Sequence, residues 1–327
     1  MTAGRSTRLL RLGVAVALTA YVLWQANPAA VWRAGASADW RWLLAAVALV
    51  LVDRTLMAYR WMVLLRALSP GTRPPFAAVL RIFFVSTFVG SFLPSLAGDM
   101  YRAYSLSRLR VSGVESAASV IMDRALGVVS MVLVAVVALA FARDLIALPG
   151  VLPTVVLAAA GCAAAASALY SERVASLALA ATGRLPGRKA RTLGAGLVDA
   201  VRKYTRHHGD VTNVLISSVG VQVIRVVQAY CLGVALGITA PLWTYFAFVP
   251  LIVIVMQIPV TVSGLGTSQV MFPLFFGAVG VPPAEAVALS LLFVALGVVG
   301  NLPGALLYAG GARHAHVGAR EEPQARA

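Results

Sequence analysis

Long apolar runs, separated by short polar connectors, recur along almost the whole chain. About 20 consecutive apolar residues are enough for a helix to cross the hydrocarbon core of a bilayer. The runs therefore predict an all-α polytopic membrane protein with about six full spans and two re-entrant helical hairpins, about eight membrane segments altogether. The six expected spans are residues 9–26, 42–65, 114–142, 151–171, 211–237 and 284–309.

Two further apolar segments are interrupted by Pro and Gly, and these predict the hairpins. Residues 82–97 form a short run that contains Gly90 and Pro94 and has Arg on both flanks. In the other half of the chain, residues 242–280 are interrupted at 259–266. Non-helical backbone at membrane depth needs surrounding protein or a water-filled cavity. Paired broken segments of this kind point to the binding site of a transporter.

The order of spans and hairpins divides the single transmembrane domain, residues 1–327, into two halves. Residues 1–150 and 151–312 each contain two crossings, a hairpin and a crossing, and the charge bias inverts the second half relative to the first. Inverted repeats of this type are common in membrane transporters. The sequence therefore predicts two half-repeats with a substrate site between them.

Composition and charge agree with a membrane protein and orient it. Hydrophobic residues make up 60% of the chain and charged residues 12%, which excludes a soluble domain. The net charge is +15, but the Arg residues cluster in connectors, as cytoplasmic loops require, so we expect no nucleic-acid partner. We predict a protein of the cytoplasmic membrane with both termini cytoplasmic. The basic segment 172–210 is expected as amphipathic helices on anionic headgroups, and residues 313–327 as a disordered tail.

The first hairpin holds the clearest candidates for binding a lipid headgroup. Ser95, Gly98, Asp99 and Arg102 follow Pro94, and Asp99 and Arg102 share a face of the helix that starts there. A helix start attracts an anion, and Ser95 or Asp99 could cap its N–H groups. The alternative is that Asp99 only caps a cytoplasmic helix while Arg102 follows the charge bias of cytoplasmic segments.

Charged and amide side chains inside the spans give further candidates. Asp123 and Arg124 lie at membrane depth, where a charge costs about 2.5 to 3.5 kcal/mol. Arg124 is a candidate phosphate ligand and Asp123 a candidate partner for another Arg, the alternative being a static ion pair between helices. Gln222, Arg225 and Gln228 share a helix face that suits a hydrated groove, or polar contacts between helices.

Corresponding places of the two halves carry charge. Asp53 and Arg54 lie in the second span, and Arg225 lies in the matching span of the second half. In the second hairpin, Ser263 and Thr267 surround Gly264 and Gly266, so the turn offers hydroxyls and backbone N–H groups to a phosphate. No catalytic motif, nucleotide site or metal-ligand spacing is present. We therefore expect no cofactor, no metal site and no enzymatic activity.

Most of the chain resembles the flippase-like membrane region of the lysylphosphatidylglycerol synthase family. The first half carries the resemblance in Ser86-Thr87-Phe88, residues 93–99 (LPSLAGD), Arg102, residues 116–120 (SAASV) and Asp123-Arg124. The segment 259–269 is similar to that family's Pro, Gly-Leu-Gly, Glu motif, so Gln269 joins the expected headgroup ligands. This chain differs where Ala97 replaces a usual Gly, Gln269 a usual Glu, and Val294 a common Arg.

The resemblance implies a protein that moves lipid between leaflets without an aminoacyl-transferase domain. The expected substrate is a phospholipid or a polyprenyl-phosphate-linked glycolipid, with its headgroup bound in a cavity at the midplane. The differences at Gln269 and Val294 argue against lysyl-lipid. The alternative is a membrane scaffold for a cytoplasmic glycosyltransferase, with residues 172–210 as the docking surface.

Overall fold

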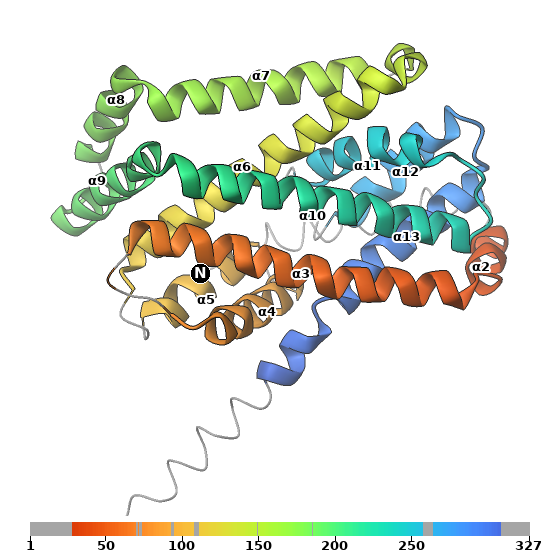
Figure 1. The fold of residues 1–327 in the computed structure, drawn as a ribbon, viewed down its shortest axis with the longest axis horizontal. Helices are drawn as coiled ribbons and strands as arrows, with labels where there is room; N and C mark the ends of the chain where they lie inside the picture. Colours follow the sequence, from red (N-terminus) through yellow and green to blue (C-terminus); the bar gives the residue numbers. More distant parts are fainter. Residues whose placement is uncertain are drawn as a thin grey trace, which may run out of the picture.

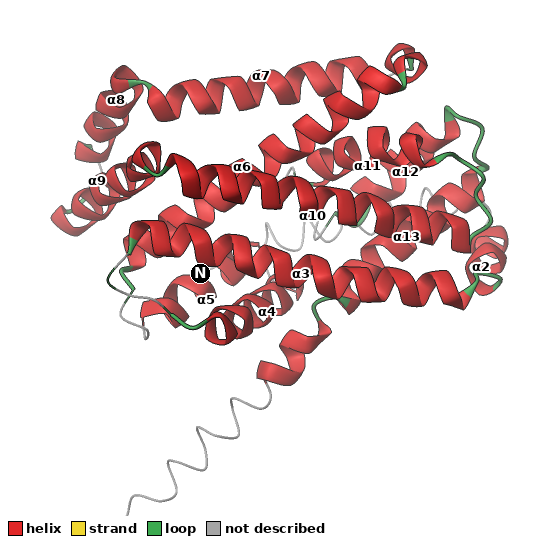
Figure 2. Cartoon of the chain, viewed as in Figure 1, coloured by secondary structure: helices red, strands yellow, loops and turns green. Residues whose placement is uncertain are grey.

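Every regular element in the described part of the chain is a helix (Figure 2). The computed structural model describes residues 28–69, 71, 74–92, 95–107, 111–148, 150–184, 186–257 and 264–308. The predicted all-α class is therefore confirmed, while the expected span 9–26 and the tail 313–327 lie outside the described residues.

Among the described residues, four helices are long and apolar enough to cross a membrane. They are α3 (Trp40–Leu68), α6 (Gly113–Phe141), α10 (His208–Ala235) and α13 (Pro283–Val299), which a break at 300–301 separates from a last helical turn ending at Tyr308. These helices make the chain a multi-pass membrane protein. Their bounds agree closely with four of the predicted spans.

The α3 and α10 helices lie side by side and run in opposite directions (Figure 1). At one end of the bundle the Asp39 N–H donates to the Ala235 carbonyl at 2.9 Å. At the other end the Tyr204 hydroxyl donates to the Leu64 carbonyl at 2.9 Å, and burial raises the pKa of this hydroxyl, so it stays protonated. We call these the Asp39 end and the Tyr204 end. The α3 and α13 helices begin near the first, and α6 and α10 near the second.

Two helical hairpins enter this bundle from opposite ends. The first consists of α4 (Phe76–Phe92) and α5 (Ser95–Ser107), and its open end packs at the Tyr204 end, where Val79 and Leu106 join Leu65. The second consists of α11 (Leu242–Met256) and α12 (Thr267–Gly277). It opens at the Asp39 end, in the core that contains Leu232 and Ile238. Figure 1 shows the hairpins at opposite sides of the bundle.

The order of elements is the same in both halves, and their directions are reversed. In the first half α3 precedes a hairpin and α6, and in the second α10 precedes a hairpin and α13. Two antiparallel copies of one arrangement agree with the predicted inverted repeat. The boundary at residue 150 remains a prediction.

The helices of the connection between the halves lie within the bounds expected for the crossing at 151–171 and for the amphipathic segment 172–210. The connection contains α7 (Val151–Tyr170) and α8 (Glu172–Gly183), and residues 151–167 and 172–183 form a pair bent by 80°. The Ser171 side-chain oxygen accepts a hydrogen bond from the Val174 N–H and so caps the start of α8. The α7 helix therefore ends before Ser171. The described residues therefore contain four or five spans, and the total of six remains a prediction.

The basic segment continues in α9 (Arg188–Lys203), which packs on α6. The remaining short helices are α2 (Pro28–Ala36), η1 (Arg143–Ala147) and η2 (Tyr204–Arg206).

Small residues allow the first hairpin to pack closely. A Cβ atom at Gly98 would lie 2.6 Å from the Ser86 carbonyl oxygen, and one at Gly304 would lie 2.1 Å from the Phe84 carbonyl oxygen. Helix association in membranes depends on such close approach of small residues. The two contacts hold α5 and the helical segment after α13 against the same turn of α4.

Candidate functional site

A cavity of about 330 Å³ lies between the arms of the first hairpin, the end of α11 and the long helices. Gly90 and Gly98 of the first hairpin line it, and so does Met256 at the end of α11. Arg54 and Arg124 lie near the middle of α3 and α6, so the cavity is at mid-depth of the bundle. This is the depth at which transporters bind their substrates.

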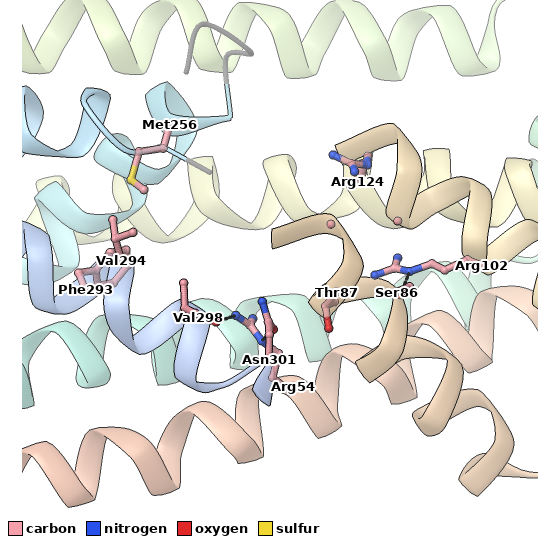
Figure 3. Close-up of a pocket in the computed structure, with 13 residues that line it drawn as sticks. Arg54, Ser86, Thr87, Arg102, Arg124, Met256, Phe293, Val294, Val298 and Asn301 are labelled. Carbon is pink, nitrogen blue, oxygen red and sulfur yellow. Dashed lines mark hydrogen bonds between the residues drawn. The ribbon is translucent and has the colours of Figure 1, made fainter. Parts of the chain in front are cut away.

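The side chains around the cavity divide into a charged side and an apolar side (Figure 3). Arg102 and Arg124 lie on one side, Met256, Phe293 and Val294 on the other, and Arg54 beside Asn301 lies between them. The complete lining is Arg54, Ser86, Thr87, Gly90, Gly98, Arg102, Arg124, Met256, Phe293, Val294, Gly297, Val298 and Asn301. Among these described residues there is no Asp or Glu. An arrangement of this kind suits an amphiphile with an anionic group.

Arg102 is held in place by the first hairpin itself. Its Nε donates to the Ser86 hydroxyl at 2.8 Å, across the close contact made possible by Gly98. Its guanidinium also lies over the rings of Trp61 and Phe83, at 5.2 and 4.7 Å from their centroids. The sequence places Arg102 about two turns after the start of α5. The fold converts that position into a fixed cation at the cavity wall.

Arg54 links three parts of the structure at the cavity. Its Nε donates to the Asn301 amide oxygen at 2.9 Å, and its Nη2 donates to the Gly297 carbonyl at 3.4 Å, where α13 is about to break. A cation near the carbonyl end of a helix is favourable. Its Nη1 forms an ion pair with the adjacent Asp53 at 2.9 Å.

Arg225 lies behind Arg54 rather than in the cavity lining. Its Nη2 is 3.7 Å from the second oxygen of Asp53, and its Nη1 donates to Gln222 at 3.3 Å. Arg54 of the first predicted half and Arg225 of the second therefore both pair with Asp53. Gln228 is buried in α10, with its amide nitrogen lacking a hydrogen-bond partner, and it does not line the cavity among the described residues.

Asp123 and Arg124 are neighbours in α6 with different surroundings. Asp123 is buried and forms an ion pair with Arg60 of α3 at 2.8 Å, while the Arg60 Nη2 also donates to the Asp123 carbonyl at 3.1 Å. The structure thus gives Asp123 an interhelical pair, one of the two roles considered for it. Arg124 has an exposed side chain that lines the cavity.

The turn of the second hairpin serves its own helix. Gly266 has a φ of 86°, and its N–H donates to the Gln269 side-chain oxygen at 2.5 Å, which caps the start of α12. Gln269 is fully buried, and Gly264 contacts the Met256 side chain that lines the cavity. Gly264, Gly266, Thr267 and Gln269 are not among the described lining residues, and the expected phosphate-binding role of this turn stays a prediction. Ser263 lies outside the described residues, as do the side chains of Ser95 and Asp99.

Sequence reasoning missed several residues of the cavity. Arg54 was noticed only as a charge inside a span, and Ser86 and Thr87 only as part of the family resemblance. Asn301 was not considered. Its amide side chain lies between Gly300 and Pro303 at the end of an apolar run, and this pattern indicates a helix break that carries a polar group. Val294, where the resembling family often has Arg, belongs to the apolar side.

Comparison with known proteins identifies the family. The family model described as the lysylphosphatidylglycerol synthase TM region matches residues 8–304. No curated protein and no solved structure matches the chain. Because the match covers most of the 327 residues, the chain belongs to this family. Membership links the protein to membrane lipids.

Proposed function

We propose that this member of the lysylphosphatidylglycerol synthase TM-region family moves a lipid between the leaflets of the cytoplasmic membrane. The observation that carries the proposal is the cavity, in which guanidinium groups from α3, α5 and α6 face an apolar wall at mid-depth. The headgroup of a phospholipid or a polyprenyl-phosphate-linked glycolipid would bind to the arginines. The first part of its chains would lie along Phe293, Val294 and Val298.

The arrangement of the hairpins suggests how the cavity would be reached from each leaflet. The first hairpin occupies the Tyr204 end and the second the Asp39 end, and residues from the arms of both line the cavity. Displacing one hairpin would open the cavity toward one leaflet while the other hairpin keeps the opposite path closed. Alternating access of inverted repeats works in this way. We place the Tyr204 end, with the basic helix α9, in the cytoplasm.

Each cavity arginine has a distinct part in this proposal. Arg124, with its exposed side chain, would form bidentate hydrogen bonds to the phosphate. Arg102 would act as a fixed charge, since aromatic rings and Ser86 restrain it. Arg54 would couple the headgroup to the break after α13, through Asn301. Binding and transport require no aminoacyl transfer, so the proposed activity is that of a transporter.

The proposal is tested by measuring transfer of a fluorescent phospholipid across vesicles that contain the purified protein. Arg124→Ala should lower the rate by about tenfold or more, because one charge-assisted interaction with the headgroup is lost. The amount of folded protein should change little, because the side chain is exposed. Gel filtration and the midpoint of thermal unfolding in detergent check folding.

Arg188→Ala is the matched control, since Arg188 is an exposed arginine at the start of α9, far along the chain from the cavity. Wild-type rates are expected for this variant. An unchanged rate in Arg124→Ala would contradict the headgroup site. Loss of function on charge reversal at Arg188 and Arg191, without any lipid transfer by the wild type, would favour the scaffold for a glycosyltransferase.

A further inference from the structure

We infer that Asp53 is a positioning residue of the proposed lipid site. Its carboxylate holds Arg54 before a headgroup binds, and it passes to Arg225 when an anionic headgroup takes its place on Arg54. This inference deepens the proposed function and rests on it, because Arg54 lines the same cavity. It links binding of the headgroup to a contact between the two halves of the chain.

Asp53 is shared unequally between the two arginines. Its Oδ2 accepts a hydrogen bond from the Arg54 Nη1 at 2.9 Å, whereas its Oδ1 lies 3.7 Å from the Arg225 Nη2. Oδ1 is buried and has no hydrogen-bond partner, and the whole residue is 1% exposed. A buried carboxylate oxygen without a donor is costly. A closer approach of Asp53 to Arg225 is therefore favourable.

Asp53 occupies a part of Arg54 that a headgroup would also need. The Arg54 Nε donates to Asn301 at 2.9 Å, and its Nη2 makes only a longer contact of 3.4 Å with the Gly297 carbonyl. A phosphate binds a guanidinium most strongly through two parallel N–H groups. Because Nε is occupied, the remaining pair is Nη1 and Nη2. A headgroup in the cavity, which Arg54 reaches in Figure 3, therefore competes with Asp53 for Nη1.

Arg225 can receive the displaced carboxylate because its present contacts are weak. Its Nη1 donates to Gln222 at 3.3 Å, and its Nη2 contacts the Met57 sulfur at 3.8 Å. The same sulfur lies 3.5 Å from the Arg54 Nη1, so Met57 contacts both guanidinium groups. A thioether sulfur is a weak acceptor, which a carboxylate replaces favourably. Charge-assisted hydrogen bonds are about 2.8 Å long, so a shift of about 1 Å completes the exchange.

The exchange also pairs every charge in this cluster. Arg54, Arg225 and Asp53 together carry two positive charges and one negative charge. With a phosphate on Arg54 and the carboxylate on Arg225, each guanidinium has an anion of its own. Charged groups at membrane depth need such partners. Binding of an anion at Arg54 therefore favours the closer pair of Asp53 and Arg225.

The consequence for transport follows from the helices that carry these residues. Asp53 lies in α3 of the first half and Arg225 in α10 of the second, and the two helices pack side by side (Figure 1). The exchange would draw them together at mid-length, between the Asp39 end and the Tyr204 end. A ligand shifts a conformational equilibrium only by binding one state more tightly than the other. Release of Arg54 by Asp53 supplies that difference in affinity.

The test measures binding of dioctanoyl phosphatidylglycerol to the purified full-length protein in a neutral detergent, by isothermal titration calorimetry. Asp53→Asn removes the charge that competes for Arg54, so the affinity should rise about tenfold. Arg225→Gln leaves the carboxylate on Arg54, so the affinity should fall about tenfold, although Arg225 is not among the described lining residues. An unchanged affinity in Arg225→Gln would overturn the inference.

The double variant separates the exchange from a simple change of net charge. If Arg225 acts through Asp53, Arg225→Gln should change the affinity by less than about twofold in the Asp53→Asn background. The same loss in both backgrounds would show that the two charges act independently, and it would overturn the inference. Arg225→Lys should retain most of the affinity, because it keeps a cation for the carboxylate. Arg188→Gln, at an exposed position in α9, is the control and should bind as the wild type does.

Rates of lipid transfer provide a result that a merely structural role would not give. Asp53→Asn should bind more tightly and yet transfer lipid more slowly, because a headgroup on Arg54 then has no competitor that helps to release it. Equal losses of binding and transfer would show that Asp53 only maintains the structure. If Asp53→Asn does not fold, the two variants at Arg225 decide, since equal affinities in Arg225→Gln and Arg225→Lys would overturn the inference.

Failure of this inference can be told from failure of the proposed function. Transfer of lipid that depends on Arg124, together with independent effects of Asp53 and Arg225 on binding, would leave the transporter standing and reject the exchange. Coupled effects on binding without transfer of any lipid would support the exchange and reject the transporter. Absence of binding in both the wild type and Asp53→Asn would reject both.

Discussion

The two hairpins have the same topology, but their side chains have different roles. The first hairpin supplies Arg102, Ser86 and Thr87 to the cavity, and its arms are held together at Gly98. The second supplies Met256, and its arms belong to the aromatic core in which Phe248, Phe272, Phe275 and Phe276 contact one another.

This difference teaches that a repeated arrangement of backbone can divide binding and packing between its copies. Polar groups in the first hairpin face the cavity, whereas the buried Gln269 of the second hairpin caps a helix. A binding site inside a membrane needs both functions, because a charged side chain is tolerated at membrane depth only where packed protein surrounds it. The following predictions test how far the two hairpins differ.

The largest expected difference is the side from which each hairpin is labelled. In a background with Cys162 and Cys231 replaced by Ala, Gly71→Cys precedes the first hairpin and Thr239→Cys precedes the second, both at exposed positions. A membrane-impermeant maleimide should label each only from one side of oriented vesicles, and the two from opposite sides. Labelling of both from the same side would show that the halves are not inverted.

Stability should depend strongly on the glycine between the arms of the first hairpin. Gly98→Ala places a Cβ atom 2.6 Å from the Ser86 carbonyl oxygen, so the arms must separate. We expect a loss of about 1 to 3 kcal/mol, which the midpoint of unfolding in detergent would report. Gly277→Ala in α12 is the matched control, since a Cβ there has nothing within 4 Å. Equal midpoints for the two variants would argue against the close packing of α4 and α5.

Transport should respond more to the first hairpin than to the second. Arg102→Gln removes a restrained cation and should lower lipid transfer by about tenfold or more. Met256→Ala removes only part of the apolar side of the same cavity, so its effect should be several times smaller. Both are measured as rates of lipid transfer in vesicles with equal amounts of folded protein. A larger effect at Met256 would reverse the roles assigned to the hairpins.

The smallest effect is expected at the start of α12. Gln269→Leu removes the acceptor of the Gly266 N–H and should reduce stability by about 1 kcal/mol, as for other helix caps, with transport unchanged. Gln257→Leu, at an exposed position at the end of α11, serves as the control; it removes only the contact of the Gln257 amide with the Met131 sulfur at 3.3 Å and should reduce stability less. A selective loss of lipid transfer in Gln269→Leu would return this residue to the headgroup site.

Most of the fold was predictable because its causes are local. A continuous apolar run can satisfy its backbone in the membrane only as a helix, so the bounds of α3, α6 and α10 follow closely from the sequence. Pro94 and the interruption at 259–266 likewise marked both hairpins. The boundary between α7 and α8 was marked as well, because Ser171, Glu172 and Arg173 follow the apolar run.

The site was only partly predictable, because its chemistry depends on which helices meet. The sequence by itself determined that charges lie at membrane depth, that two segments are broken, and that the family is one of membrane lipids. Only the tertiary structure decided that Asp123 faces Arg60 while its neighbour Arg124 faces the cavity. It also decided that Asp53 is shared by Arg54 and Arg225. The physical reason is that burial and helix formation follow from nearest neighbours in the chain, whereas the partner of a charge comes from another helix.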